Sequence, residues 1–354
     1  MSTIAVLPGD GIGPEVTAAA VSVLRSVRPD LTFTQCLIGG AALRAGKAPL
    51  PDETRAVCDA SAAILFGAVG GFEFNDNPFD RRPEFALLSL RRIYDLYANI
   101  RPVRVFPGLE EASTLRASVV AGLDLIVLRE LTSGLYYGHK ETTIVDGARQ
   151  AIDTMLYRDS EIERIVRMGF ELARARRKEL TSVDKQNVLE TSRLWRTVAN
   201  EIAPEYPDVK LTHMLVDNAA MQLLREPRQF DVMVMENMFG DILSDEAAML
   251  TGSLGNLPSA SVGKKTDRGQ FGLYEPISGT APDIAGKGLA NPTAAILSAA
   301  LLARYSLGDA ASAGRIEAAV SKALAAGART ADLVRNGAAS LSTSAFTERV
   351  AAQL

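Results

Sequence analysis

Cysteine is scarce in this 354-residue chain, and the only two, Cys36 and Cys58, lack the Cys-x-x-Cys spacing of a zinc or redox site. Such scarcity argues against a disulfide framework and is typical of a reducing compartment. No apolar run is long enough to span a bilayer, and the first residues lead directly into a predicted strand, without the pattern of a secretory signal peptide. We therefore expect a cytoplasmic protein that is not associated with a membrane.

An excess of basic charge is also missing. The chain has 38 Lys and Arg against 42 Asp and Glu, which gives a formal net charge of −4. Its one dense basic cluster, at 174–178, has the spacing of a helix face rather than of a nucleic-acid-binding stripe. These features argue against nucleic acid as a partner. The length is sufficient for about two domains with a large core.

Buried strands and amphipathic helices alternate along the chain, which predicts an α/β fold with helices on both faces of a sheet. Segment 132–158 differs, because it alternates in polarity and is rich in Thr, Tyr and Ile. We expect it to form a β-arm that leaves the body of its domain and is available for pairing with another chain. Predicted strands lie at 4–11, 31–36, 62–71, 124–131, 211–218 and 231–237, and predicted helices at 14–27, 161–178, 191–203 and 292–304.

Two aspartates four residues apart, Asp241 and Asp245, are the most informative feature of the sequence. On a helix they project from one face, where like charges repel each other unless a cation lies between them. They follow the predicted strand at 231–237, and ligands of open α/β sheets usually bind at the carboxyl ends of strands. Carboxylate oxygens suit Mg²⁺ or Mn²⁺ rather than zinc. A solvated acidic face is the alternative.

Residues 9–14, Gly-Asp-Gly-Ile-Gly-Pro, follow a strand and open a helix, as dinucleotide-binding loops do. Their spacing is not Gly-x-Gly-x-x-Gly, and Pro14 is typical of helix initiation. The acidic residue that a Rossmann fold carries at the end of its second strand is also missing. We therefore expect no Rossmann fold, and leave open that this turn approaches some ligand with its backbone.

Six long motifs follow one another in order over nearly the whole chain: GDGIGPEV (9–16), LLSLRRIYDLYANIRPV (87–103), LRELTSGLYYG (128–138), TSVDKQNVLETSRLWR (181–196), residues 216–261 around ENMFGDILSDEAAM (236–249), and LYEPISGTAPDIAGKGLANP (273–292). Together they resemble the metal- and NAD-dependent β-decarboxylating dehydrogenases, the isocitrate/isopropylmalate dehydrogenase family, and most closely its isopropylmalate branch. The resemblance implies a two-domain fold that is not a Rossmann fold and that carries the β-arm. The first domain, on the cofactor side, would comprise 1–99 and 250–354, and the second, with the metal and the dimer interface, 100–249.

The resemblance also implies substrate and metal ligands. Arg91, Arg101 and Arg129 match the arginines that bind the malate carboxylates, for which a guanidinium offers bidentate pairing. From the sequence we place Arg101 after an apolar helix and Arg129 at the carboxyl end of a strand. We place Asp217 at the end of the predicted strand that starts at residue 211. It matches the third metal carboxylate of the family, and Asp241 and Asp245 match the other two.

Catalytic roles follow from the same resemblance. Lys185, which we place just past a helix, and Asp217 would reach the active site from the partner subunit of a homodimer and help to remove the substrate's hydroxyl proton. Tyr136 matches the tyrosine that donates a proton late in the reaction. A surface lysine and a packed aromatic on the arm are the ordinary alternatives.

Substrate choice rests on the helix at 82–92, where isocitrate-type enzymes place Ser and Asn to meet a third carboxylate. Here Leu87 and Leu88 occupy that face, with Glu84 before them. An apolar wall cannot compensate a buried carboxylate, so we expect a hydrophobic branch such as isopropyl. The leucines could instead be core residues, and Phe85 and Ala86 leave the size of the branch open.

The reaction implied is the NAD-dependent, metal-assisted oxidative decarboxylation of 3-isopropylmalate to 4-methyl-2-oxopentanoate and CO₂, in leucine biosynthesis. The alternatives are another 3-substituted malate, D-malate or tartrate, or a dimeric homologue without catalysis.

Cofactor choice rests on Asp283, which matches the residue that accepts the adenosine 2′-hydroxyl and repels a 2′-phosphate, so that NAD is expected rather than NADP. Asn291 would meet the adenine. Ser278 stands where the family usually has a histidine that packs against the cofactor, which predicts weaker NAD⁺ binding or a specialised paralogue. The implied cofactor-binding residues are Ile12, Glu275, Ser278, Gly279, Thr280, Ala281, Pro282, Asp283, Ile284, Ala285 and Asn291.

Overall fold

The computed structural model describes residues 2–266, 269–334 and 339–354, and the chain divides into two compact units. Unit 1 comprises Met1–Leu96, Arg104–Gly122 and Ala248–Leu354, and unit 2 comprises Tyr97–Val103 and Leu123–Ala247. Residues 104–122, which the sequence-based division placed in the second domain, therefore group with unit 1. There Gly108 O accepts a hydrogen bond of 2.5 Å from Arg329 Nη2.

Unit 1 contains a mixed sheet in the order β2-β1-β3-β12-β11. β1 runs parallel to β2 and β3, and β12 runs parallel to β3 but antiparallel to β11. Four of the five strands run parallel, and only β11 runs the other way. The strands are β1 Thr3–Gly9, β2 Thr32–Gln35, β3 Ala63–Ala68, β11 Pro258–Thr266 and β12 Gly269–Pro276.

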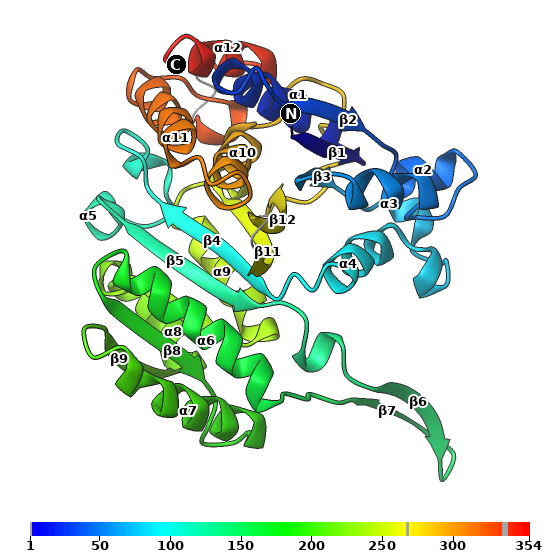
Figure 1. Cartoon of the computed structure of the whole chain (residues 1–354), viewed down its shortest axis with the longest axis vertical. Helices are drawn as coiled ribbons and strands as arrows, with labels where there is room; N and C mark the ends of the chain where they lie inside the picture. The colour runs from blue at the N-terminus through cyan, green and yellow to red at the C-terminus, as the bar shows by residue number, and fades with distance from the viewer. Residues whose placement is uncertain (1, 267–268, 335–338) are drawn as a thin grey trace. The chain divides into compact units, whose positions relative to one another are not determined.

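Helices cover both faces of this sheet, as the sequence predicts. The helix α10 is buried from Thr293 to Ala303 and contacts α1, α11 and the strands β11 and β12, as Figure 1 shows. A helix that is apolar all round requires such burial. On the other face, α3 and α4 pack against the strands in a core that includes Cys58, Leu90 and Phe66. The helices are α1 Gly13–Val27, α2 Gly40–Arg44, α3 Asp52–Asp59, α4 Pro83–Ile93, α5 Ala117–Val120, α10 Thr293–Tyr305, α11 Ala310–Ala325 and α12 Thr343–Ala351.

Unit 2 contains strands in the order β4-β5-β10-β8-β9, and β10 runs parallel to both β5 and β8. The helices α6 and α7 pack against each other and onto the strands, and α8 contacts β8 and β9. The elements are β4 Ala98–Arg104, β5 Asp124–Glu130, α6 Asp159–Arg174, β8 Glu179–Asp184, α7 Glu190–Ile202, β9 Lys210–Leu215, α8 Val216–Arg225, β10 Val232–Met235 and α9 Asn237–Met249. In the described part of the chain, no helix is long and apolar enough to cross a membrane.

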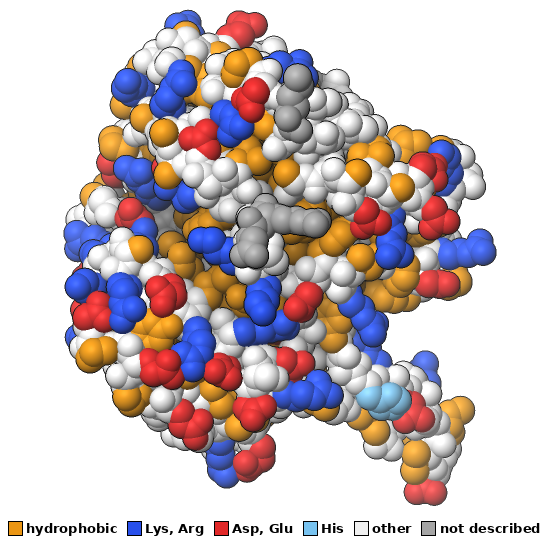
Figure 2. All heavy atoms as spheres, viewed as in Figure 1, with side chains coloured by type: hydrophobic (Ala, Val, Ile, Leu, Met, Phe, Trp, Pro, Cys, Tyr) orange, Lys and Arg blue, Asp and Glu red, His pale blue; other side chains and the backbone are white. Residues whose placement is uncertain are grey.

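The predicted β-arm is confirmed as an antiparallel hairpin of β6, Lys140–Val145, and β7, Ala148–Asp153 (Figure 1). Its side chains are almost all exposed, and Ile144 is 74% exposed. Figure 2 shows hydrophobic side chains on the surface of this hairpin. A two-stranded hairpin is marginally stable by itself in water. The arm is therefore available for pairing with a further surface.

Three local placements from the sequence are wrong. Arg101 lies inside the strand β4 rather than after a helix, and Lys185 follows the strand β8 rather than a helix. Both strands were missed because β4 contains Pro102 and β8 is rich in polar residues, although Leu180–Asp184 is buried. Asp217 lies in the first turn of α8, where a carboxylate suits the helix dipole, because β9 already ends at Leu215.

Candidate functional site

The carboxylate of Asp241 is the centre of a charged cluster in unit 2. Asp241 and Asp245 lie one turn apart on α9, which begins at Asn237 directly after β10. Tyr136 Oη donates to Asp241 Oδ2 at 2.7 Å, and Arg129 Nη1 donates to Asp241 Oδ1. Arg101 lies 3.8 Å from Asp241 and 3.4 Å from Asp245. The fold thus brings together five residues that the sequence proposed for the site.

Neutral side chains orient the two buried guanidinium groups. Arg129 Nε and Nη2 donate to Asn237 Oδ1 at 3.0 and 2.8 Å. Arg101 Nε donates to Asn99 Oδ1 at 2.6 Å, and its Nη1 donates to Ser244 Oγ at 2.5 Å. Sequence reasoning missed these three orienting residues. In the sequence, only their position could have pointed to them, because each is a polar residue that lies beside a strand or within the acidic motif.

Glycine is required where α9 passes Arg129. A Cβ atom at Gly240 would lie 2.5 Å from Arg129 Cγ and 2.6 Å from its Cβ, which is closer than van der Waals contact allows. The helix therefore approaches β5 closely enough for Asp241 to reach the guanidinium.

The phenol of Tyr136 stays protonated over the physiological range. Partial burial and the hydrogen bond to Asp241 raise the pKa of Tyr136 to about 12. The guanidinium of Arg129 lies 5.5 Å from the centre of its ring. A neutral phenol beside a carboxylate and a guanidinium can donate a proton.

The acidic pair fits a hard divalent cation in the chemistry of its donors. Burial is the main cause that raises the pKa of Asp245, Asp241 adds to it, and the guanidinium of Arg101 opposes it. A cation between the two carboxylates would relieve their repulsion. Within the described residues, no group of three or more His, Cys, Asp or Glu side chains could hold a metal. One chain thus offers two carboxylates, which suits Mg²⁺ with water or a further ligand in its remaining positions.

Lys185 and Asp217 form a separate pair in unit 2. Lys185 Nζ lies 3.0 Å from Asp217 Oδ2, and this hydrogen bond lowers the pKa of Asp217 below its usual value. The backbone N–H of Lys185 donates to Ser192 Oγ at 3.0 Å, which fixes the end of β8. Among the described residues of one chain, Asp217 does not form a three-carboxylate group with Asp241 and Asp245 that could hold a metal.

In unit 1, the proposed substrate helix α4 carries a buried ion pair. Arg91 Nη2 donates to Glu275 Oε1 at 2.9 Å, and both residues are buried. Leu87 packs against the core cluster around Leu90, so it serves at least partly as a core residue, while Leu88 is half-buried. Leu87 and Leu88 are both half-buried, but only Leu87 packs against this cluster, which leaves Leu88 as the better candidate for a substrate contact.

Glu84 lies in the first turn of α4, close to the proposed cofactor loop. A Cβ atom at Gly70 would lie 3.3 Å from Glu84 Oε1 and 3.5 Å from Thr280 Cγ2. The carboxylate of Glu84 and the side chain of Thr280 thus border the same small space.

The glycine turn at 9–14 approaches the protein's own loop. Ile12 N–H donates to Thr280 O at 2.9 Å, and a Cβ atom at Gly11 would lie 2.0 Å from that oxygen. Ala281 adopts φ 40°, a left-handed conformation that costs a non-glycine residue about 1 kcal/mol. The turn therefore fixes the shape of the loop that carries Ser278, which is half-buried, and Asp283, whose side chain is exposed.

The side chain of Asn291 is engaged within the protein. Its Nδ2 donates to Asn256 Oδ1 and to Asp332 Oδ2, each at 3.0 Å, and its Oδ1 accepts from Thr293 N–H at 3.0 Å. If Asn291 meets an adenine, its backbone is the part that remains for the contact. Asp332 was not singled out from the sequence, where it stands in an alanine-rich region without a motif.

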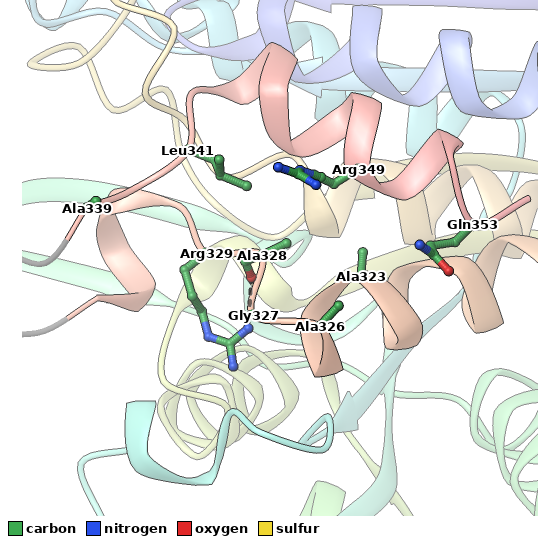
Figure 3. A pocket seen from close by; sticks show the side chains of 9 residues that line it. All are labelled: Ala323, Ala326, Gly327, Ala328, Arg329, Ala339, Leu341, Arg349 and Gln353. Atoms are coloured by element: carbon green, nitrogen blue, oxygen red, sulfur yellow. Dashed lines mark hydrogen bonds between the residues drawn. The ribbon is translucent and has the colours of Figure 1, made fainter.

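A cavity of about 250 Å³ near the end of α11 contains none of the proposed site residues. Figure 3 shows its lining, which includes Leu341, Arg349 and Gln353. The guanidinium of Arg329 donates to Leu324 O and Ala328 O at 2.6 and 2.8 Å. This arginine therefore closes the end of α11.

The sequence is similar over nearly its whole length to enzymes of one family. The sequence model of the family described as isocitrate/isopropylmalate dehydrogenase matches residues 3–350. The 3-isopropylmalate dehydrogenase of Symbiobacterium thermophilum is 54% identical over 359 residues, with 98% of this chain and 97% of that protein covered. The 3-isopropylmalate dehydrogenase of Bacillus subtilis is 55% identical over 357 residues, with 99% and 96% covered.

Solved structures share the fold over the whole chain. The isocitrate dehydrogenase of Methylococcus capsulatus superposes with a TM-score of 0.88 at 36% identity, covering 100% of this chain and 99% of that one. A β-decarboxylating dehydrogenase of Thermococcus kodakarensis, in its apo form, gives a TM-score of 0.81 at 33% identity, with 100% and 96% covered. The α/β fold of the isocitrate/isopropylmalate dehydrogenases, which the sequence led us to expect, is confirmed. The chain belongs to the isocitrate/isopropylmalate dehydrogenase family.

Proposed function

We propose that this protein catalyses the NAD⁺-dependent oxidative decarboxylation of 3-isopropylmalate to 4-methyl-2-oxopentanoate and CO₂, in leucine biosynthesis. The observation that carries the proposal is the cluster in unit 2, where two buried guanidinium groups and a protonated phenol surround a pair of carboxylates. The 54–55% identity to proteins named 3-isopropylmalate dehydrogenase supports the choice of substrate.

Arg129 and Arg101 bind the substrate carboxylates in this proposal. Each already has part of its guanidinium fixed by a neutral oxygen, so that little side-chain freedom is lost when a dianion binds. Arg91 supplies the third guanidinium, held by Glu275. The half-buried Leu88 favours an apolar branch at C3 over a third carboxylate, because a carboxylate there would be left without a partner.

The metal ligands are Asp241 and Asp245, joined by Asp217 of a second subunit. Bound Mg²⁺ or Mn²⁺ would supply Lewis-acid chemistry, which would make the substrate's 2-hydroxyl more acidic. Lys185, hydrogen-bonded to Asp217, takes up the hydroxyl proton.

The redox and carbon steps then follow. Bound NAD⁺ would accept the hydride from C2. The bond between C3 and its carboxylate would then break to release CO₂, leaving the electron pair of that bond as an enolate across C2 and C3. Tyr136 donates the proton that C3 requires, which its raised pKa allows because the phenol is neutral. The exposed carboxylate of Asp283 is suited to accept the adenosine 2′-hydroxyl and disfavours a 2′-phosphate.

A homodimer with shared active sites is part of the proposal. Met221 and Leu224 on α8 and Ile242 on α9 are exposed by 49–60%, and a second copy packed against these helices would bury their apolar side chains. The apolar side chains of the β-arm suit the same partner. A second copy would also supply the third carboxylate that one chain lacks among its described residues.

NADH formation with Mg²⁺, measured in parallel on isopropylmalate, malate, tartrate, isocitrate and homoisocitrate, tests the proposed function. We expect isopropylmalate to give the highest kcat/KM. A higher value for malate or tartrate would move the protein to a sibling activity. No NADH from any of the five acids would favour a homologue without catalysis.

Removal of the metal is expected to abolish turnover. After EDTA treatment and extensive dialysis, NADH formation should fall below about 1% of its initial rate, and Mg²⁺ or Mn²⁺ should restore it, because the Lewis acid assists both steps. Addition of K⁺ or Na⁺ alone at matched ionic strength is the control. Activity that persists after dialysis would show that the reaction does not require the metal.

Ser278→His is expected to tighten NAD⁺ binding, since an imidazole would add apolar and stacking contact with the cofactor where the hydroxymethyl group of serine offers little. We expect KM for NAD⁺ to fall by about three- to tenfold, with KM for isopropylmalate unchanged. Ser344→His, an exposed serine of α12, is the matched control. An unchanged KM for NAD⁺ in Ser278→His would contradict the assigned role.

A further inference from the structure

Two buried glutamates in unit 2 have no part in the proposed chemistry. Glu130 is fully buried and directly follows Arg129 at the end of β5, and Glu236 is 4% exposed and directly precedes α9. Burial is the main cause that raises the pKa of each carboxyl group. Such groups are retained only where several hydrogen bonds compensate their burial.

Glu236 holds the beginning of α9. Its Oε1 accepts from Phe239 N–H at 2.8 Å and its Oε2 accepts from Met238 N–H at 2.9 Å. These N–H groups have no partner within a helix, and a carboxylate at this end also complements the helix dipole. Glu236 therefore fixes the start of the helix that carries Asp241 and Asp245.

Glu130 holds the turn that leads to Tyr136. Its Oε1 accepts from the N–H and the hydroxyl of Thr132 at 2.9 and 3.0 Å, and its Oε2 accepts from Ser133 N–H at 3.0 Å. Tyr136 lies three residues further on, in the 3₁₀ turn Gly134–Tyr136. The position of its phenol thus depends on a turn that one buried carboxylate closes.

The hydroxyl of Tyr157 joins the two carboxylates. It lies 3.2 Å from Glu130 Oε2 and 3.4 Å from Glu236 Oε2, and it accepts from Asn237 N–H at 3.0 Å. Its ring packs edge-on against Trp195, with centroids 5.8 Å apart. Gly134 permits this approach, because a Cβ atom there would lie 2.6 Å from the hydroxyl.

We propose that Tyr157 is a positioning residue that sets the phenol of Tyr136 and the start of α9 relative to each other. One hydroxyl contacts the carboxylate that holds each element. It also fixes Asn237 N–H, and the side chain of the same asparagine orients Arg129. The roles of Tyr136 and α9 in this inference rest on the proposed function. The hydrogen bonds are independent of it.

The variant Tyr157→Phe keeps the ring and removes only the hydroxyl. We expect kcat with isopropylmalate to fall by about 10- to 100-fold and the Kd for Mn²⁺, measured by electron paramagnetic resonance, to rise by about tenfold, the usual size for residues that orient metal ligands. KM for NAD⁺ should stay within about twofold, since the proposed cofactor residues belong to unit 1. Hydrogen exchange at Asn237 N–H should become faster, because its acceptor is lost.

The matched control is Tyr206→Phe, which also removes a hydroxyl from unit 2 while its ring stays stacked on Phe170. It should leave kcat and the Kd for Mn²⁺ unchanged. A merely structural role would lower the folded fraction without changing the Kd of the folded protein. If Tyr157→Phe does not fold, Glu236→Gln, which keeps the shape and one oxygen acceptor, replaces it.

Wild-type values of kcat and of the Kd for Mn²⁺ in folded Tyr157→Phe would overturn the inference. Failure of the proposed function has a different signature, because wild-type protein would then form no NADH from any of the five acids. In that case the Kd for Mn²⁺ and the hydrogen-exchange rate of Asn237 N–H still test whether Tyr157 positions the start of α9.

Discussion

Lys185→Ala is expected to lower kcat by roughly 100- to 10,000-fold, the range typical of a lost general base. The side-chain nitrogen Nζ lies 3.0 Å from the carboxylate of Asp217, at the end of the buried strand β8. The substitution therefore removes both the proposed proton acceptor, the free amine of Lys185, and the partner of a proposed metal ligand. Initial rates of NADH formation at saturating isopropylmalate, NAD⁺ and Mg²⁺ measure the effect. A kcat near the wild-type value would contradict the role of Lys185 as the general base.

Two controls separate chemistry from folding in this experiment. Lys210→Ala removes an exposed lysine from β9 in the same unit and should leave kcat unchanged. Thermal unfolding of Lys185→Ala should be close to wild type, because the carboxylate of the ion pair it breaks is 61% exposed and such a pair contributes little stability.

Mixing two inactive variants tests whether a second subunit supplies Lys185. In a heterodimer of Lys185→Ala and Asp245→Asn subunits, one of the two sites contains both native residues if the sites are shared. Co-refolding the variants in equal amounts should then restore about a quarter of wild-type activity, since half of the dimers are mixed. No recovery, although mixed dimers form, would place Lys185 and Asp245 of one site in the same chain.

Asp245→Asn is expected to weaken Mn²⁺ binding by about 100-fold and to lower kcat/KM for isopropylmalate by a similar factor, because a neutral amide replaces one of the two carboxylates of the acidic pair. Asp245 is the better choice than Asp241. The guanidinium of Arg101 keeps its bonds to Ser244 and Asn99 when Asp245 is changed, whereas Asp241 is bonded to the buried Arg129 and to Tyr136.

Isothermal titration with Mn²⁺ and steady-state kinetics at several Mn²⁺ concentrations measure this prediction. Asp208→Asn, which removes an exposed carboxylate from unit 2, is the control and should change neither quantity. A wild-type Mn²⁺ affinity in Asp245→Asn would leave the acidic pair as a solvated helix face, the alternative that the sequence allowed.

Periodicity predicted the long helices and the apolar strands well. The helices α1, α6, α7 and α10 and the strands β1, β3, β5 and β10 are confirmed close to the expected bounds. The missed strands are those in which tertiary burial overrides composition. β8, for example, reads Glu-Leu-Thr-Ser-Val-Asp, yet all but the first residue are buried, because it lies between β10 and β9.

For the site residues too, the sequence predicted local geometry but not contacts between distant segments. The sequence placed Asp241 and Asp245 on one helix face, since an interval of four residues is a local property of the helix. It could not show that the side chain of Leu87 packs into the core or that Asn291 is engaged by Asp332. Those contacts join segments of the chain that no motif connects.

By itself, the sequence determined the long helices and the apolar strands, the family, the acidic pair and the arginines. Only the tertiary structure decided that Asp241 meets Arg129 and Tyr136, which are more than 100 residues away, and that one tyrosine joins Glu130 to Glu236. The physical reason is the order of the strands. Parallel pairing sets Arg129 of β5 opposite Met235 of β10, so the residues that follow each strand meet at the same edge of the sheet. Spacing along the chain fixes geometry within an element, whereas strand order and register fix geometry between elements.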